Sequence, residues 1–130
     1  MELAYRIVLF AVGVVNLLPA LLAFAPSKIS KSYGISLPDA NYELLLRHRA
    51  TLFAVVGGLL VFSALTRRYY GLATTVGLFS MLSFVALYAA VGPGINAELK
   101  RVMQIDVVAA VALAVAFLLY LYRAPASRPL

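Results

Sequence analysis

The sequence predicts an all-α integral membrane protein, a four-helix bundle with up-down topology and a long first loop at residues 26–38. Hydrophobic residues make up 64% of the 130-residue chain and charged residues only 12%, whereas a soluble domain is about 45–50% apolar and about 25% charged. A water-soluble fold of this size cannot bury so much apolar surface. Four long uncharged runs supply the spans, since a helix crosses about 30 Å of hydrocarbon with about 20 residues.

The four spans follow from uncharged runs at residues 7–27, 50–66, 69–97 and 107–122. The first and third runs are long enough by themselves, but the second and fourth reach bilayer thickness only if flanking charged residues enter the helix. A cleaved signal peptide is disfavoured, because the first apolar stretch is longer than the usual h-region of about 7–15 residues. We therefore expect one domain over residues 1–130, with helices near 4–25, 40–66, 69–91 and 97–122.

The connections predict how the spans follow one another. The Arg-Arg pair at residues 67–68 alone joins the second and third spans, so these must form an antiparallel hairpin. The Gly-Pro-Gly sequence at residues 92–94 ends the third helix, since proline cannot continue it. Asn96 is expected to cap the fourth helix, and Ser36 or Asp39 the second.

The basic residues predict localisation and orientation. They lie at the ends of apolar runs, which is typical of membrane flanks, so nucleic acid is excluded as a partner. Five of the 11 Lys and Arg residues lie on the side of both termini. The other six include Arg47 and Arg49, which enter the second helix and leave four in the loops. We expect a multi-pass protein of the bacterial inner membrane with both termini in the cytoplasm. The alternative is a dual-topology protein, which would also show such a near balance of basic residues.

Polar side chains inside apolar spans mark the candidate site, because burying them unpaired costs several kcal/mol. By their depth along the spans, most of them fall in the half of the bilayer away from the termini. The terminal half carries almost nothing polar beyond Thr74 and Thr75. The candidates for ligand binding or ion pairing are Asn16, Arg47, His48, Arg49, Ser83 and Asp106.

Asp106 is the key residue of this set, because the fourth span reaches bilayer length only by including it. A carboxylate at that depth should pair with a cation or be protonated. Arg49 is the best partner by depth, with Arg47 and Arg101 as alternatives. An ion pair would pin the second helix to the fourth, whereas the functional alternative is a ligand or proton site lined by the polar cluster.

The composition leaves few groups for chemistry. The chain has no cysteine, which excludes disulfides, thiolate metal ligands and cysteine nucleophiles. Its one histidine, His48, can supply only one metal or haem ligand. We therefore expect no metal and no cofactor, and we assign no catalytic residue.

Two further patterns predict packing. Asn16 lies three residues before Pro19, which indicates a kink whose freed backbone carbonyls the amide helps to satisfy. Ala50, Ala54 and Gly58 recur at every fourth position, with Gly57 adjacent. Small residues at that spacing favour a close helix–helix approach.

Several motifs are shared with a known family. They are Asn16-Leu17-Leu18-Pro19, Ser32-Tyr33-Gly34, the Arg47-His48-Arg49 block with its flanks, residues 77–84, and Arg101-Val102 with Asp106. On these residues the chain resembles a bacterial family of small four-helix membrane proteins often labelled phosphopantetheine adenylyltransferase. That label implies a nucleotide-binding sheet and a His-containing phosphate loop, and this sequence has neither. The resemblance thus implies the four-helix architecture and the polar block, but no activity.

The function predicted from the sequence is the binding of a lipid or small amphiphile at the polar cluster, or a role as an accessory subunit. One alternative is a small proton-coupled transporter that uses Asp106. Another is a membrane enzyme acting on an apolar substrate, for which a lone histidine and one deep carboxylate supply few groups. The expected partners are membrane lipid, a small hydrophobic ligand, and a second copy of the chain or another membrane protein.

Overall fold

The computed structural model describes residues 1–36 and 39–123, and every regular element in them is helical. Four helices are long and apolar enough to cross a membrane, with the first running on through its 3₁₀ extension to Leu21. The predicted all-α four-helix fold is confirmed. The elements are α1 (Glu2–Leu17), η1 (Leu18–Phe24), α2 (Pro26–Tyr33), α3 (Ala40–Thr66), α4 (Tyr70–Val91) and α5 (Ala97–Arg123).

The helix bounds follow the apolar runs except around the first connection. α3 begins and ends where the sequence predicts, and α4 and α5 differ from the prediction by one residue. The α-helix of the first span ends at Leu17 and tightens into the 3₁₀ helix η1, because Pro19 lacks the N–H that would continue the α-helical ladder. The expected long loop contains the short helix α2, which Gly34 ends in the left-handed conformation at φ 60°.

α1 and α3 approach each other closely at two glycines. A Cβ atom added to Gly57 would lie 2.7 Å from the carbonyl oxygen of Gly13 and 2.8 Å from Leu17 Cγ. The two backbones therefore touch where neither glycine has a side chain. Gly58, which the small-residue pattern included, has nothing within 4 Å of an added Cβ. The small-residue pattern thus predicted a close contact on the correct helix, α3, but Gly57 makes the contact and Gly58 does not.

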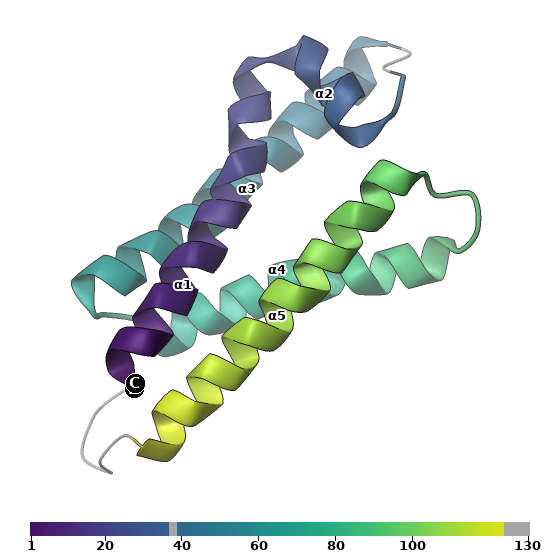
Figure 1. The fold of residues 1–130 in the computed structure, drawn as a ribbon. Helices are drawn as coiled ribbons and strands as arrows, with labels where there is room; N and C mark the ends of the chain where they lie inside the picture. Colours follow the sequence, from purple (N-terminus) through teal and green to yellow (C-terminus); the bar gives the residue numbers. More distant parts are fainter. Residues whose placement is uncertain (37–38, 124–130) are drawn as a thin grey trace.

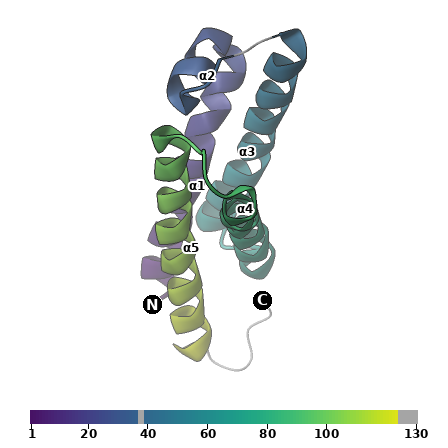
Figure 2. The same cartoon turned by 90° about the vertical axis from the view of Figure 1, so that its right-hand side faces the viewer.

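The turn between α3 and α4 is tight. Arg67 and Tyr69 both have φ near 60°, and the Ser63 hydroxyl donates a hydrogen bond of 2.6 Å to the carbonyl of Arg68. This confirms the antiparallel hairpin. Beyond the turn α4 diverges from α3 and crosses α5, which the two perpendicular views make plain (Figures 1 and 2). α3 and α4 are thus joined at one end of the bundle and spread apart at the other.

The end of the bundle that holds Glu2 and Arg123 is closed by aromatic rings. The Tyr5 ring stacks on Tyr120 with centroids 5.0 Å apart and meets the edge of Tyr70 at 5.1 Å. The Tyr5 hydroxyl lies 2.6 Å from Thr74 Oγ1, in a buried hydrogen bond. The expectation that the half of the bundle near the termini carries almost nothing polar is therefore wrong. Tyrosine hydroxyls on α1 and α4 are polar groups in this half, and each forms a hydrogen bond to the other helix.

Candidate functional site

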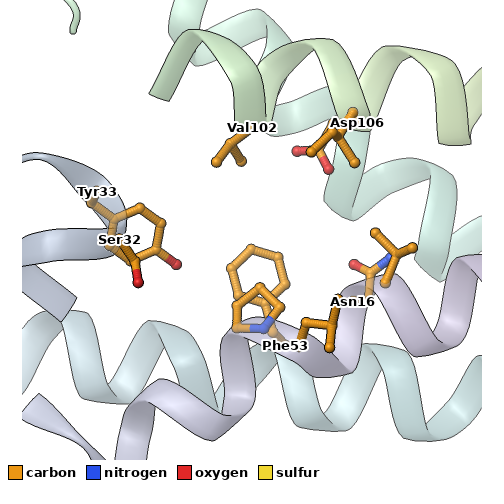
Figure 3. Close-up of a pocket in the computed structure, with 10 residues that line it drawn as sticks. Asn16, Ser32, Tyr33, Phe53, Val102 and Asp106 are labelled. Carbon is orange, nitrogen blue, oxygen red and sulfur yellow. The ribbon is translucent and has the colours of Figure 1, made fainter. Parts of the chain in front are cut away.

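A cavity of about 300 Å³ lies toward the end of the bundle away from Glu2 and Arg123, between α1, η1, α2, α3 and α5 (Figure 3). Four side chains in its wall are polar: Asn16, Ser32, Tyr33 and Asp106. The rest of the wall is apolar and consists of Val15, Leu18, Pro19, Phe53, Val102 and Ile105. Side chains from five elements between residues 15 and 106 therefore converge on one cavity, and four of them are polar.

Two of the polar groups are buried hydrogen-bond acceptors. Asp106 is 8% exposed and Asn16 4% exposed. Asn16 Nδ2 donates to the Val12 carbonyl at 2.9 Å, one helical turn back, which leaves its Oδ1 for the cavity. Within residues 1–36 and 39–123 no side chain or backbone group hydrogen-bonds to the Asp106 carboxyl or forms an ion pair with it. The cavity thus holds acceptors that lack donors.

Tyr33 reaches the same space from α2. Burial raises the pKa of its phenol, the nearby Arg49 cation lowers it, and the Asp106 charge raises it. The hydroxyl therefore keeps its proton at neutral pH and can donate into the cavity. Tyr33 and Ser32 were not among the predicted site residues, because their segment was expected to be a loop. Two signals marked the segment: Gly34, a residue typical of a helix C-terminus, and the shared Ser32-Tyr33-Gly34 motif.

Asn96 holds α2 over the cavity. Its Nδ2 donates to the carbonyls of Tyr33 and Gly34 at 2.7 and 3.0 Å, and its Oδ1 accepts from the Leu99 N–H at 2.9 Å. The predicted N-cap of the fourth helix is confirmed. The same side chain also binds the carbonyls at the C-terminal end of α2. The start of α5 therefore fixes the position of the α2 residues that line the cavity.

Arg49 does not pair with Asp106. Three aromatic rings surround its guanidinium carbon instead, with centroid distances of 4.8 Å to Phe84, 5.4 Å to Phe53 and 5.5 Å to Tyr33. In the part of the chain that the structure describes, no Arg49 nitrogen lies within 4.0 Å of the Asp106 carboxylate. The predicted ion pair between the second and fourth helices is therefore not made, because aromatic rings occupy the space beside the cation.

The remaining candidates lie outside the Asp106 cavity. Arg47 and His48 are exposed on α3, and Arg47 bonds to Glu43 at 3.3 Å. Ser83 Oγ donates to the carbonyl of Ser80 at 2.9 Å, a bond back along its own helix. Of the six candidates, the structure brings Asn16 and Asp106 to one cavity, and Arg49 and Ser83 to another between α3 and α4.

A groove of about 520 Å³ between α1 and α5 continues the Asp106 cavity along the bundle. Val15 and Ile105 line both the cavity and the groove. The other small and apolar side chains in the wall of the groove are Ala11, Val12, Val108, Ala109 and Ala112. Two polar side chains, Arg101 and Gln104, complete the lining. The cavity that holds Asp106 and this more apolar groove thus share a boundary.

No protein-family model, curated protein or solved structure matches the chain. Its four long apolar helices are those of a small multi-pass membrane protein. Among the residues described, no three His, Asp or Glu side chains gather where they could hold a metal ion.

Proposed function

We propose that the chain binds a single-chain amphiphile, with a hydrogen-bond-donating head in the Asp106 cavity and the hydrocarbon tail in the groove between α1 and α5. The head is a hydroxyl or an ammonium group. The observation that carries the proposal is the shared boundary at Val15 and Ile105, where a cavity with four polar side chains in a mainly apolar wall adjoins a groove whose wall is almost wholly apolar.

The chemistry of the cavity favours a donor as the head group. The Asp106 carboxyl and Asn16 Oδ1 are buried acceptors that the surrounding protein leaves without donors. An unpaired polar group in an apolar setting is costly, and a ligand hydroxyl or ammonium offsets that cost directly. A carboxylate head would instead bring a second negative charge beside Asp106. Tyr33 supplies a hydroxyl that can donate to an oxygen of the head.

The groove matches a hydrocarbon chain. From Asp106 to Ala112 the axis of α5 runs about 9 Å at 1.5 Å per residue, and small alanines at positions 109 and 112 keep that face of the helix shallow. An alkyl chain lying there would exchange contact with lipid tails for contact with two helices. Its polar end would then lie at the depth of Asp106.

Native mass spectrometry of the protein released from nanodiscs tests the proposal. The probes are hexadecanol, hexadecylamine and palmitate, which share a chain length and differ in the head group. We expect retention of the alcohol and the amine but not of the acid, and loss of the amine in Asp106→Asn because the charge is gone.

A neighbouring pair of valines provides the control for the groove. Val15→Phe places a ring in the shared boundary and should abolish retention of every probe. Val14→Phe should leave it unchanged, because Val14 is equally exposed, at 38% against 37%, but lines neither cavity nor groove. Equal retention in the two valine variants, or palmitate retained as well as hexadecanol, would contradict the proposal.

A further inference from the structure

A second cavity, of about 360 Å³, opens between α3 and α4 where these helices spread apart. Its polar wall consists of Arg49, Ser80 and Ser83, and its apolar wall includes Leu52, Phe84 and Leu87. We propose that this cavity binds an anionic lipid, with the acidic head group on the Arg49 guanidinium and an acyl chain between the two helices.

The Arg49 guanidinium has hydrogen-bond donors without acceptors in the described structure. Arginine carries five N–H donors in a planar fork, yet within residues 1–36 and 39–123 none of them finds an acceptor. Its Nη2 is buried, and it is the buried side-chain nitrogen that the described structure leaves unsatisfied. A buried cation without an acceptor is unfavourable, so an oxyanion that enters the cavity gains both a charge partner and hydrogen bonds.

The three rings around Arg49 direct where such an anion can bind. Aromatic rings stabilise a guanidinium through its face, and Phe84, Phe53 and Tyr33 lie at cation–π distance from it. They accept no strong hydrogen bond at the edge of the fork. The edge is where carboxylates and phosphates bind in a bidentate manner, and none of the described residues that line this cavity is acidic.

The position of Arg49 favours a lipid over a free anion. It is the last charged residue before the uncharged run 50–66, so it lies at the level where a span passes from head groups into hydrocarbon. Leu52 and Leu87 continue the cavity along the apolar parts of α3 and α4 and are more than half exposed. A head group on Arg49 therefore has a place for its chain directly beneath it.

This site differs from the Asp106 cavity in the charge that it presents. Phe53 lines both spaces, with the carboxylate in one and the guanidinium in the other. The two sites therefore select opposite head groups, and each is tested with its own probes and its own variants. Failure of one proposal does not decide the other.

The test is native mass spectrometry after release from nanodiscs that contain equal amounts of phosphatidylglycerol and phosphatidylcholine with the same acyl chains. We expect selective retention of phosphatidylglycerol, reduced about tenfold or more in Arg49→Gln, or about 1.4 kcal/mol. The control is Arg47→Gln, which removes the same charge two residues away from an exposed position and should retain the lipid.

A second pair of variants leaves the guanidinium in place. Leu87→Trp fills the cavity and should also release the lipid, whereas Leu82→Trp on the same helix, outside the cavity, should not. Three outcomes overturn the proposal: equal retention of the two lipids, unchanged retention in both Arg49→Gln and Leu87→Trp, or displacement of phosphatidylglycerol by inorganic phosphate alone, which would make this a site for a free anion.

Discussion

Replacing Gly57 with alanine tests the contact that positions the two helices carrying Asn16 and Arg49. An added Cβ would lie 2.7 Å from Gly13 O, 2.8 Å from Leu17 Cγ and 2.9 Å from Leu17 N. Two of these three atoms belong to the backbone of α1, so the helix itself must move. The substitution therefore separates α1 from α3 at the base of the Asp106 cavity.

The magnitude follows from two opposing effects. Overpacking a close contact costs about 1–3 kcal/mol, while exchanging glycine for alanine inside a helix gains up to about 1 kcal/mol. Because the clash is with backbone, we expect Gly57→Ala to lower the free energy of unfolding by about 1–2 kcal/mol. Gly58→Ala, one residue away with nothing within 4 Å of the added Cβ, should be neutral or stabilising by up to about 1 kcal/mol.

Reversible unfolding by sodium dodecyl sulfate in mixed micelles, followed by far-ultraviolet circular dichroism, measures both variants against the parent protein. The expected difference between Gly57→Ala and Gly58→Ala is about 1–3 kcal/mol. Equal unfolding free energies for the two alanine variants would show that α1 and α3 do not touch at Gly57.

Three further substitutions test other contacts by the same unfolding assay. Asn96→Ala removes two hydrogen bonds to the end of α2 and the N-cap bond within α5; it should lower the free energy of unfolding by about 1–2 kcal/mol and speed amide exchange in α2, whereas unchanged exchange would show that Asn96 does not hold α2 in place. Tyr5→Phe keeps the ring stacking but loses the hydrogen bond to Thr74, so we expect the free energy of unfolding to fall by about 1 kcal/mol. An unchanged value would show that this bond does not stabilise the bundle. Gly34→Ala places a side chain at φ 60° and close to Glu98 Oε2; it should cost about 1–2 kcal/mol, whereas a neutral result would mean that α2 does not end there.

The spans could be predicted from the sequence because each is marked by residues that are consecutive along the chain. Uncharged runs, the Arg67-Arg68 junction and the glycines at positions 92 and 94 fix where helices start and stop, and α3 matches its prediction at both ends. The first connection was harder. Its helix α2 is only eight residues long and rich in serine and lysine, which is too short for an apolar repeat to stand out, and the capping glycine is a weak indicator alone.

The site was predicted only in part, because depth along a span does not determine direction around it. Successive helical residues are rotated by about 100°, so residues at equal depth can face different neighbours. Arg49 and Asp106 illustrate this: they belong to adjacent cavities that share Phe53. Asn16 and Asp106 were expected together and do line one cavity, but the groove that continues it depends on side chains that no single motif marks.

The measurement that bears most directly on amphiphile binding is photolabelling with a hexadecanol analogue that carries a diazirine midway along its chain, followed by mapping of the labelled residues. We expect labels concentrated on the groove side of α1 and α5, at Val108 and Ala112 among others, that disappear in Val15→Phe and persist in Val14→Phe. Labels spread evenly over the exposed faces of all four spans, and unchanged by either substitution, would contradict it.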